Sequence, residues 1–252
     1  MSRNSRSKYN DDSEVVSINS TPKSNALKIK IDDLKTFEPL TKNQETFFKA
    51  YKQGDYFISL LGSPGTGKTF IALLKALEEV MDKSNPFNKI IIVRSAVQTR
   101  DSGFLPGDLN EKMALYEDPY VQICSDLFTK KDAYQRLKEQ HVIEFTSTTA
   151  LRGMTFDNAV IIVDECQSMT FHELNTVISR TGNQSKIIFV GDMKQNDLIK
   201  KASDVSGLPH FVEVAKTMNE FTLITFTPDD IVRSSLVKSW IIAVEEFDER
   251  TD

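Results

Sequence analysis

One stretch of the sequence has the residue types and the spacing of a loop that holds the phosphates of a nucleoside triphosphate. Its glycines allow the backbone to turn with several N–H groups pointing inward, where phosphate oxygens can bind. Lys68 is placed to reach the β- and γ-phosphates, and the hydroxyl of Thr69 is placed to ligate Mg²⁺. The residues predicted to bind the nucleotide are Gly62, Ser63, Pro64, Gly65, Thr66, Gly67, Lys68 and Thr69.

The sequence on either side of this loop is typical of a strand followed by a helix. The apolar run 56–61 precedes the loop, and residues 70–77, rich in Leu, Ile and Ala, follow it. A phosphate loop needs this context, and the N-terminus of the following helix adds partial positive charge. A Gly-rich turn that arose by chance is the alternative, but it accounts for neither flank.

Two adjacent acids, Asp164 and Glu165, directly follow the apolar strand predicted at 160–163. An acid at this place can hold Mg²⁺ through water, which makes Asp164 a second predicted metal ligand beside Thr69. Glu165 can orient or deprotonate an attacking water. The pair therefore favours hydrolysis over simple binding of the nucleotide. Two solvated acids at a strand end are the alternative.

Two glutamines are candidates for contact with the nucleotide. Gln195 follows the strand predicted at 186–190 and could sense the γ-phosphate or the attacking water, or it could be an ordinary loop residue. Gln44 offers a donor and an acceptor together, as reading the edge of adenine requires. The nearby Thr41 is explained equally well as the N-cap of a helix that runs to about Tyr51.

Five arginines are candidates for contact with phosphate groups. Arg180 ends the helix that follows the two acids, and Arg233 lies at the start of the last predicted helix. Either could stabilise charge on the γ-phosphate, in its own subunit or in a neighbouring one. Capping of helix carbonyls explains Arg180 equally well. Arg94, Arg100 and Arg152 lie at strand ends or in loops and are predicted to contact the phosphate backbone of a nucleic acid.

Strands and helices alternate along the chain, which predicts βαβ units and a mainly parallel sheet covered by helices on both faces. The motifs follow predicted strands, so we expect them to meet at the carboxyl edge of the sheet. Residues 26–34 are predicted to form a short edge strand or an attached segment, and a last helix is predicted from Pro228 to about Glu246. The strands are predicted at 56–61, 90–93, 142–145, 160–163, 186–190 and 221–226.

Length and composition limit the classes of protein that the chain can represent. The 252 residues, 40% of them hydrophobic, suffice for one large α/β domain, predicted at 25–252 after a flexible polar arm at 1–24. The net charge of −5 excludes binding of nucleic acid through overall positive charge, so such a site must be a local patch. We find no apolar stretch of membrane-spanning length, no secretory signal and two cysteines without metal-ligand spacing, which together predict a cytoplasmic protein.

Over residues 40–241 the sequence resembles the PhoH family of P-loop ATPases, which is related to the first RecA-like domain of superfamily 1 helicases. The chain departs from the family pattern at Ser95, Cys166 and Ser168, where proline, alanine and asparagine are usual, and these variants suggest the phage-encoded branch. Besides the phosphate loop, the resemblance is carried by the blocks Val93–Val97, Gly103–Lys112, Leu151–Phe156, Val163–Gln167, Gly191–Asp197, Ser206–Leu208 and Asp230–Val237.

The resemblance implies a RecA-like P-loop NTPase fold, ATP binding and hydrolysis with Mg²⁺, and RNA or single-stranded DNA as the polymer partner. It also implies a homo-oligomer, because a superfamily 1 motor closes its ATP site between two RecA-like domains and this chain has the length of one. A ring such as a hexamer would let a neighbour supply the missing wall. The alternatives are a ribonuclease or nuclease accessory, and a nucleotide-gated scaffold without hydrolysis. A phage-encoded protein would work in the cytoplasm of its host.

Overall fold

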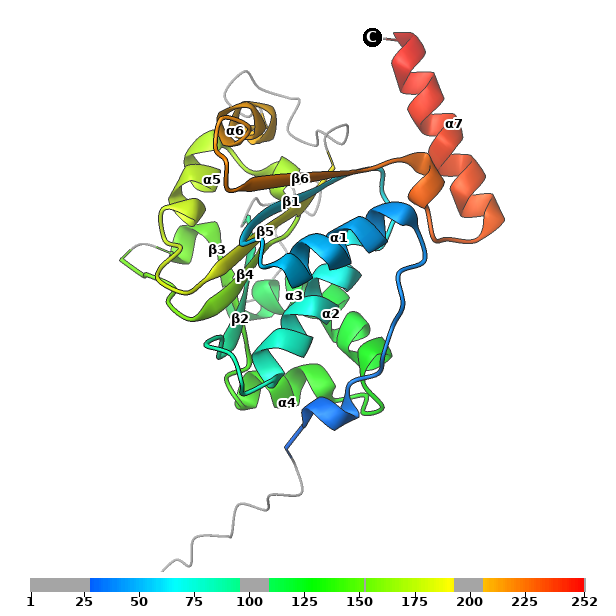
Figure 1. The fold of residues 1–252 in the computed structure, drawn as a ribbon. Coiled ribbons are helices and arrows are strands. Elements are labelled where there is room, and N and C mark those ends of the chain that lie inside the picture. The colour runs from blue at the N-terminus through cyan, green and yellow to red at the C-terminus, as the bar shows by residue number, and fades with distance from the viewer. Residues whose placement is uncertain (1–27, 96–108, 152, 193–205, 252) are drawn as a thin grey trace, which may run out of the picture.

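Six parallel strands form the centre of the protein, in the order β3-β2-β4-β5-β1-β6 (Figure 1). The computed structural model describes residues 28–95, 109–151, 153–192 and 206–251. Every neighbouring pair of strands is parallel, so all six carboxyl ends lie at one edge of the sheet. The strands are β1 (Phe57–Gly62), β2 (Lys89–Arg94), β3 (Ile143–Ser147), β4 (Ala159–Val163), β5 (Lys186–Gly191) and β6 (Phe221–Phe226).

Helices cover both faces of this sheet and give the protein three layers (Figure 1). One buried cluster joins the sheet to α1–α4, and a second joins its opposite face to α5 and α6. The predicted three-layer α/β fold is therefore confirmed. The helices are α1 (Lys42–Gln53), α2 (Lys68–Met81), α3 (Leu109–Leu127), α4 (Ala133–Glu139), α5 (Phe171–Ile178), α6 (Leu208–Ala215) and α7 (Ser235–Thr251).

The central strands are mainly apolar because both of their faces are buried. In β1, Ile58 and Leu60 pack on the side of α1–α4, whereas Phe57 and Leu61 pack on the side of α5 and α6. This alternation follows from the two-residue period of a strand. All five residues of β4 are buried for the same reason, so an unbroken apolar run is what an interior strand of this sheet requires.

The segment before α1 is attached to the domain without joining the sheet. Ile31–Asp33 form a short 3₁₀ helix, and the Asp33 carboxylate accepts a hydrogen bond from the Lys30 N–H at 2.9 Å. Asp33 also pairs with Lys130 at 3.2 Å, and Leu34 makes one antiparallel bridge to Phe128. For the described part of 26–34, the edge strand was thus the wrong alternative and the attached segment was the right one.

The predicted last helix is interrupted, because the chain turns back to the phosphate loop before α7 begins. Pro228–Asp230 form only a 3₁₀ turn, in which the Asp230 carboxylate accepts from the Thr227 N–H at 2.9 Å. The Val232 N–H then donates to the carbonyl of Gly65 at 3.0 Å, which requires extended backbone in place of a helix. The prediction of a continuous helix from Pro228 was therefore wrong.

Helix α7 extends away from the sheet beyond the end of β6 (Figure 1). It exposes three large apolar side chains, Leu236, Trp240 and Phe247, each at least 66% accessible. Among the described residues, no helix combines the length and the apolar character needed to cross a membrane.

Candidate nucleotide-binding site

The loop from Gly62 to Thr69 is shaped by backbone contacts that only glycine permits. Gly62 has φ +128°, and a Cβ there would lie 1.9 Å from the carbonyl oxygen of Phe226. Gly67, with φ +80°, turns the chain directly into α2, so the helix N-terminus faces the concave side of the loop. The Ser63 N–H donates to the Phe226 carbonyl at 3.1 Å, which ties the loop to the end of β6. The loop is thus a fixed turn at the N-terminus of α2, the kind of place where an anion is favoured.

Lys68 is folded across the loop and bonded to its carbonyls. Its Nζ donates to the carbonyl oxygens of Gly62 at 2.8 Å and Ser63 at 2.7 Å. Burial lowers the pKa of Lys68, while the negative charges of Asp192 and Glu165 oppose that shift. The amine therefore lies in the loop itself, where a phosphate oxygen could replace a carbonyl as its partner.

Asp164 directly follows β4 and connects the end of that strand to the phosphate loop. Its Oδ1 accepts from the Thr69 hydroxyl at 3.0 Å, and its Oδ2 accepts from the Tyr120 hydroxyl at 2.7 Å. Burial raises the pKa of Asp164, the charge of Glu165 raises it further, and the hydrogen bond from Tyr120 opposes both. A hydroxyl and a carboxylate at this separation fit Mg²⁺, which prefers oxygen ligands and usually retains several waters.

Glu165 has a strained backbone and a side chain that is held from two sides. Its φ of +52° lies in the left-handed region, which is uncommon for a residue other than glycine and is often found at functional sites. Gln167 Nε2 donates to Glu165 Oε2 at 2.6 Å, and the guanidinium of Arg94 lies 3.8 Å from Oε1. The Gln167 oxygen in turn accepts from the Asp192 N–H at 3.1 Å, which links the ends of β4 and β5.

These groups line a single pocket with a volume of about 740 Å³. That size suits a nucleotide, since ligand pockets range over roughly 300–1,000 Å³. Apart from the loop and the acids, the lining is a mixture of apolar and polar side chains from the segment before α1 and from α1, α2 and α3. They include Phe37, Leu40, Phe48, Phe70, Leu74, Pro119, Gln122 and Ile123.

The structure places two of the predicted arginines in this pocket. The Cγ of Arg233 lies 3.1 Å from the position that a Cβ on Gly65 would take, so Arg233 covers the phosphate loop of its own chain. Arg94 lines the same pocket and donates to the carbonyl of Tyr116 at 3.4 Å. Arg94 was predicted to contact nucleic acid, but its guanidinium lies beside Glu165, at the candidate hydrolytic centre.

Arg180 lies at the opposite edge of the sheet from the phosphate loop. Helix α5 returns from the carboxyl end of β4 toward the amino end, because a βαβ connection must bring the chain back. The carbonyl of Arg180 accepts from the N–H of Phe156, which precedes β4, and Thr181 bridges the same residue. Arg180 therefore cannot contact a phosphate bound in its own subunit. Of the two alternatives predicted for its action on the γ-phosphate, the one within the same subunit was wrong.

Gln44 supports the phosphate loop from outside. Its side chain is buried, with Nε2 donating to the Thr66 carbonyl at 2.9 Å and Oε1 accepting from the Leu40 N–H at 2.8 Å. Each of these bonds uses one of the two N–H groups or one of the two oxygen lone pairs of the amide, so they leave one donor and one acceptor for an adenine edge. Thr41 is the N-cap of α1, as predicted. Gln195, Arg100, Arg152 and the arm 1–24 lie outside the described residues.

Sequence reasoning assigned no role to Tyr120, which donates to Asp164, or to Gln167, which donates to Glu165. Tyr120 lies 44 positions before Asp164, and no local spacing connects the two residues. One signal was present, since a tyrosine within a buried helix usually needs a partner for its hydroxyl. Among the described residues, no group of three or more His, Cys, Asp and Glu side chains is placed to hold a metal ion by itself.

The fold and the site define a P-loop NTPase with a RecA-like domain. A family model described as "PhoH-like protein" matches residues 36–245, and the chain belongs to this family. It is 35% identical over 213 residues, 84% of this chain, to a "PhoH-like protein" of Bacillus subtilis. It is 32% identical over 239 residues, 93% of this chain, to "Protein PhoH" of Escherichia coli.

The chain spans only part of these relatives, 65% of the Bacillus protein and 66% of the Escherichia protein. Among solved structures, it resembles the Hef helicase domain of Pyrococcus furiosus with a TM-score of 0.42 and 12% identity, over 72% of this chain and 38% of that one. The assignment to the family rests on the family model and on the sequence relatives.

Proposed function

We propose that the protein binds ATP with Mg²⁺ in this pocket and hydrolyses it. The observation that carries the proposal is the 3.0 Å hydrogen bond from Thr69 to Asp164. This bond connects the phosphate loop to the acid that follows β4, inside the pocket that Lys68 and Glu165 also line. A loop that only bound Mg²⁺ and nucleotide would need Asp164 but would have no use for the second acid, Glu165.

Each group of the pocket has a distinct role in this proposal. The N–H groups of the loop and Lys68 would bind the β- and γ-phosphates, and Thr69 and Asp164 would hold Mg²⁺. When bound, this ion offsets phosphate charge. Glu165 would orient and deprotonate the attacking water, and Gln167 and Arg94 would position Glu165. We assign stabilisation of the developing phosphate charge to Arg233, because it covers the loop of its own chain.

The direct test of this assignment is the variant Glu165→Gln. We expect it to bind ATP with unchanged affinity and to hydrolyse it about 10²- to 10⁴-fold more slowly, the usual contribution of a general base. Glu144→Gln is the matched control, because Glu144, on β3, pairs with Lys89, on β2, away from the acids. Full activity of the Glu165 variant would show that another group activates the water.

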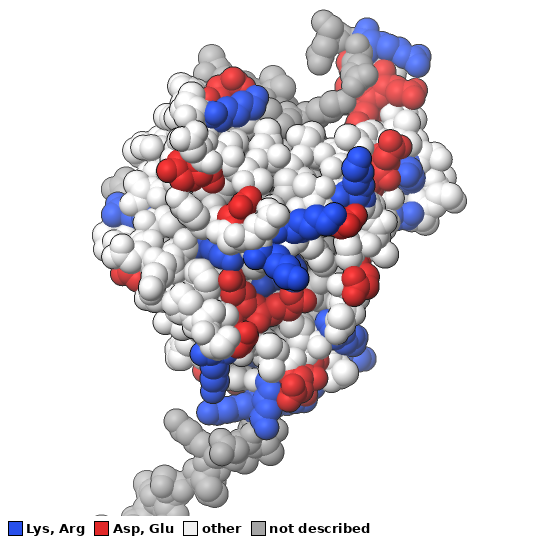
Figure 2. Space-filling model, in the orientation of Figure 1, with Lys and Arg blue, Asp and Glu red and all other residues white. Residues whose placement is uncertain are grey.

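As the polymer partner we propose RNA or single-stranded DNA, on the resemblance to the first domain of superfamily 1 helicases. On the face that Figure 2 shows, basic side chains lie among acidic ones, so contact must be local. ATP turnover measured with RNA, with single-stranded DNA and without polymer should reveal stimulation that weakens steeply with salt. RNA shortening without ATP that persists when Lys68 is replaced would favour a nuclease.

We further propose that the chain assembles into a ring, with a hexamer as the expected form, in the cytoplasm of a cell or of a phage host. The exposed apolar side chains of α7 support self-association, because contiguous exposed apolar surface commonly marks an interface. Arg180 could then act only on the ATP of a neighbouring subunit. Sedimentation of an active monomer, with turnover unchanged on dilution, would reject the ring.

A further inference from the structure

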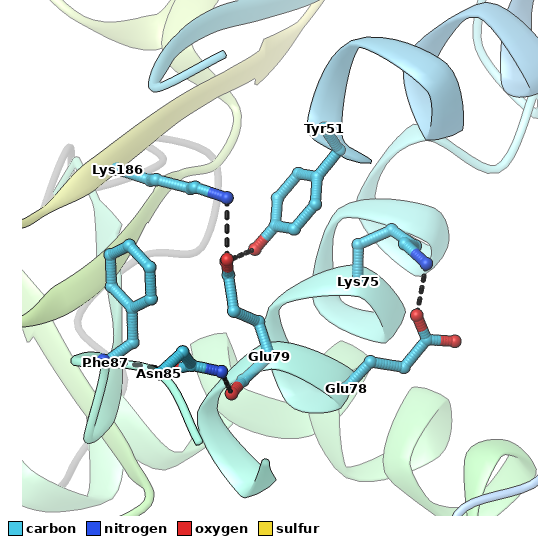
Figure 3. Close-up of polar contacts among 7 residues, drawn as sticks. All are labelled: Tyr51, Lys75, Glu78, Glu79, Asn85, Phe87 and Lys186. Atoms are coloured by element: carbon cyan, nitrogen blue, oxygen red, sulfur yellow. Dashed lines mark hydrogen bonds and ion pairs between the residues drawn. The ribbon is translucent and has the colours of Figure 1, made fainter. Parts of the chain in front are cut away.

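Three buried tyrosines each donate a hydrogen bond to a carboxylate. Tyr51 donates to Glu79 at 2.6 Å, Tyr134 donates to Glu117 at 2.5 Å, and Tyr120 donates to Asp164 at 2.7 Å. Figure 3 shows the first of these pairs, which joins α1 to α2 inside the layer of helices. The pair formed by Tyr120 differs from the other two, because its acceptor lines the nucleotide pocket.

The Asp164 carboxylate is fixed by two donors that come from different elements. Thr69, at the start of α2, binds Oδ1, and Tyr120, in the middle of α3, binds Oδ2. The Tyr120 side chain is 1% exposed, and its ring packs on Phe145 of β3 with 5.8 Å between ring centroids. Its hydroxyl therefore has little freedom to move away from the carboxylate.

The two donors, Thr69 and Tyr120, would have different roles when a metal ion is bound. Thr69 is itself a candidate ligand, whose oxygen would offer a lone pair to the metal ion while its hydrogen is donated to Asp164. Tyr120 contacts Asp164 on the other oxygen and can keep its hydrogen bond whether or not the ion is present. Groups that orient a metal-binding carboxylate in this way commonly change metal affinity about 10- to 100-fold when they are removed.

We propose that Tyr120 is a positioning residue that holds the Asp164 carboxylate in the orientation needed to bind Mg²⁺ together with Thr69. This proposal rests on the proposed ATPase function. Helix α3 reaches the second acid as well, since the Tyr116 carbonyl accepts from Arg94, whose guanidinium lies beside Glu165. Helix α3 thereby supports both acids from the same side.

The test is the variant Tyr120→Phe, which keeps the packed ring and removes only the hydroxyl. Tyr51→Phe and Tyr134→Phe are the matched controls, because each loses the same kind of buried hydrogen bond away from the pocket. The first readout is binding of a fluorescent ADP analogue without turnover, titrated with Mg²⁺. The second is electron paramagnetic resonance of Mn²⁺ in the presence of ADP.

We expect Y120F to need about 10- to 100-fold more metal for half-maximal binding, while both controls match the wild type. Saturating Mg²⁺ should restore kcat for ATP hydrolysis, which distinguishes a positioning role from general loss of structure. Unchanged metal affinity in Y120F, or a lower kcat that Mg²⁺ does not restore, would overturn the proposal. A wild-type protein that binds no nucleotide with Mg²⁺ would instead reject the proposed function itself.

Discussion

The two ends of α2 each place a charged group in a polar cluster, and the two clusters are built differently. Near the end of the helix, Glu79 pairs directly with Lys186 at 2.7 Å and accepts from Tyr51 at 2.6 Å (Figure 3). At its start, Lys68 bonds to the carbonyls of the phosphate loop, and the two acids of the pocket are held by other groups. The first cluster pairs Lys186 directly with Glu79, whereas in the second Lys68 bonds to carbonyls and the two acids bond to other groups.

This difference separates a stabilising cluster from a binding site. The Lys186 amine also lies 4.1 Å from the centre of the Tyr51 ring, so that charge has a complete set of partners. In the pocket, burial raises the pKa of Asp164 and lowers the pKa of Lys68, which means that folding disfavours both charged forms. Charges held in this way are available to a phosphate and a cation, at some expense in stability.

The largest effect is expected from Lys186→Met, which removes one partner from the closed cluster. Glu79, whose side chain is only 19% exposed, would lose its cation, and loss of a partner from a largely buried pair costs about 3–5 kcal/mol of unfolding free energy. Urea unfolding would measure the loss, and ATP turnover per folded molecule should stay at the wild-type level. A loss below about 1 kcal/mol would mean that the Lys186–Glu79 pair stabilises the protein no more than an exposed ion pair does, which would contradict the prediction.

The same substitution at the other end of the helix should have the reverse outcome. Lys68→Met is expected to reduce ATP turnover about 10²- to 10³-fold, as removal of one charge-stabilising group does elsewhere. Its unfolding free energy should be unchanged or increased, because burial already disfavours the Lys68 charge. Paired turnover and unfolding measurements on the two methionine variants would test the comparison, and loss of stability in both would break it.

A smaller effect, of opposite sign for stability and activity, is expected from Asp164→Asn. The folded pKa of Asp164 is raised above its ordinary value of 3.8, so the wild type loses stability as pH rises from that value through the folded pKa. The asparagine variant escapes this loss and should be more stable by about 1 kcal/mol at neutral pH, while its turnover falls.

The advantage of the Asp164 variant should disappear when the pH falls below 3.8, where the wild-type carboxyl is neutral in both the folded and the unfolded state. Thermal unfolding of the two proteins across this pH range provides the measurement. An advantage that stays constant at every pH would mean that the ionisation of Asp164 is not its source.

The smallest effect on the folded chain is expected from Trp240→Glu on α7. Trp240 is 70% exposed, so its replacement should change the unfolding free energy of a subunit by less than about 0.5 kcal/mol. Its charge should nevertheless disrupt packing between copies and shift sedimentation toward the monomer. Lys238→Glu, on the same helix, controls for added negative charge, and equal sedimentation of both variants and the wild type would exclude α7 as the interface.

Local sequence predicted the elements whose chemistry is carried by adjacent residues. The phosphate loop and the Asp164–Glu165 pair follow directly from strand ends, and parallel strands necessarily bring those ends together. The reversal of α5 was predictable on the same grounds, so of the two alternatives left open for Arg180, contact within its own subunit could have been excluded from the sequence. Arg94 and Tyr120 could not be placed, because their partners depend on how α3 packs across the edge of the sheet.

The break in the last helix shows the same limit. Pro228 is a good first residue of a helix, yet the Val232 N–H bonds to Gly65 in the phosphate loop, far away in the sequence. Such a long-range hydrogen bond overrides the local helix propensity, and it cannot be predicted from the spacing of residues in the sequence.

A crystal structure with a non-hydrolysable ATP analogue and Mg²⁺ tests the central claim most directly. We predict that the triphosphate lies in the loop of residues 62–69 with Lys68 on its terminal phosphates, and that the metal ion lies between Thr69 and Asp164 with Tyr120 still bonded to the carboxylate. An analogue bound at another place, or a loop that still closes on its own lysine in every subunit at saturating ligand, would contradict the account.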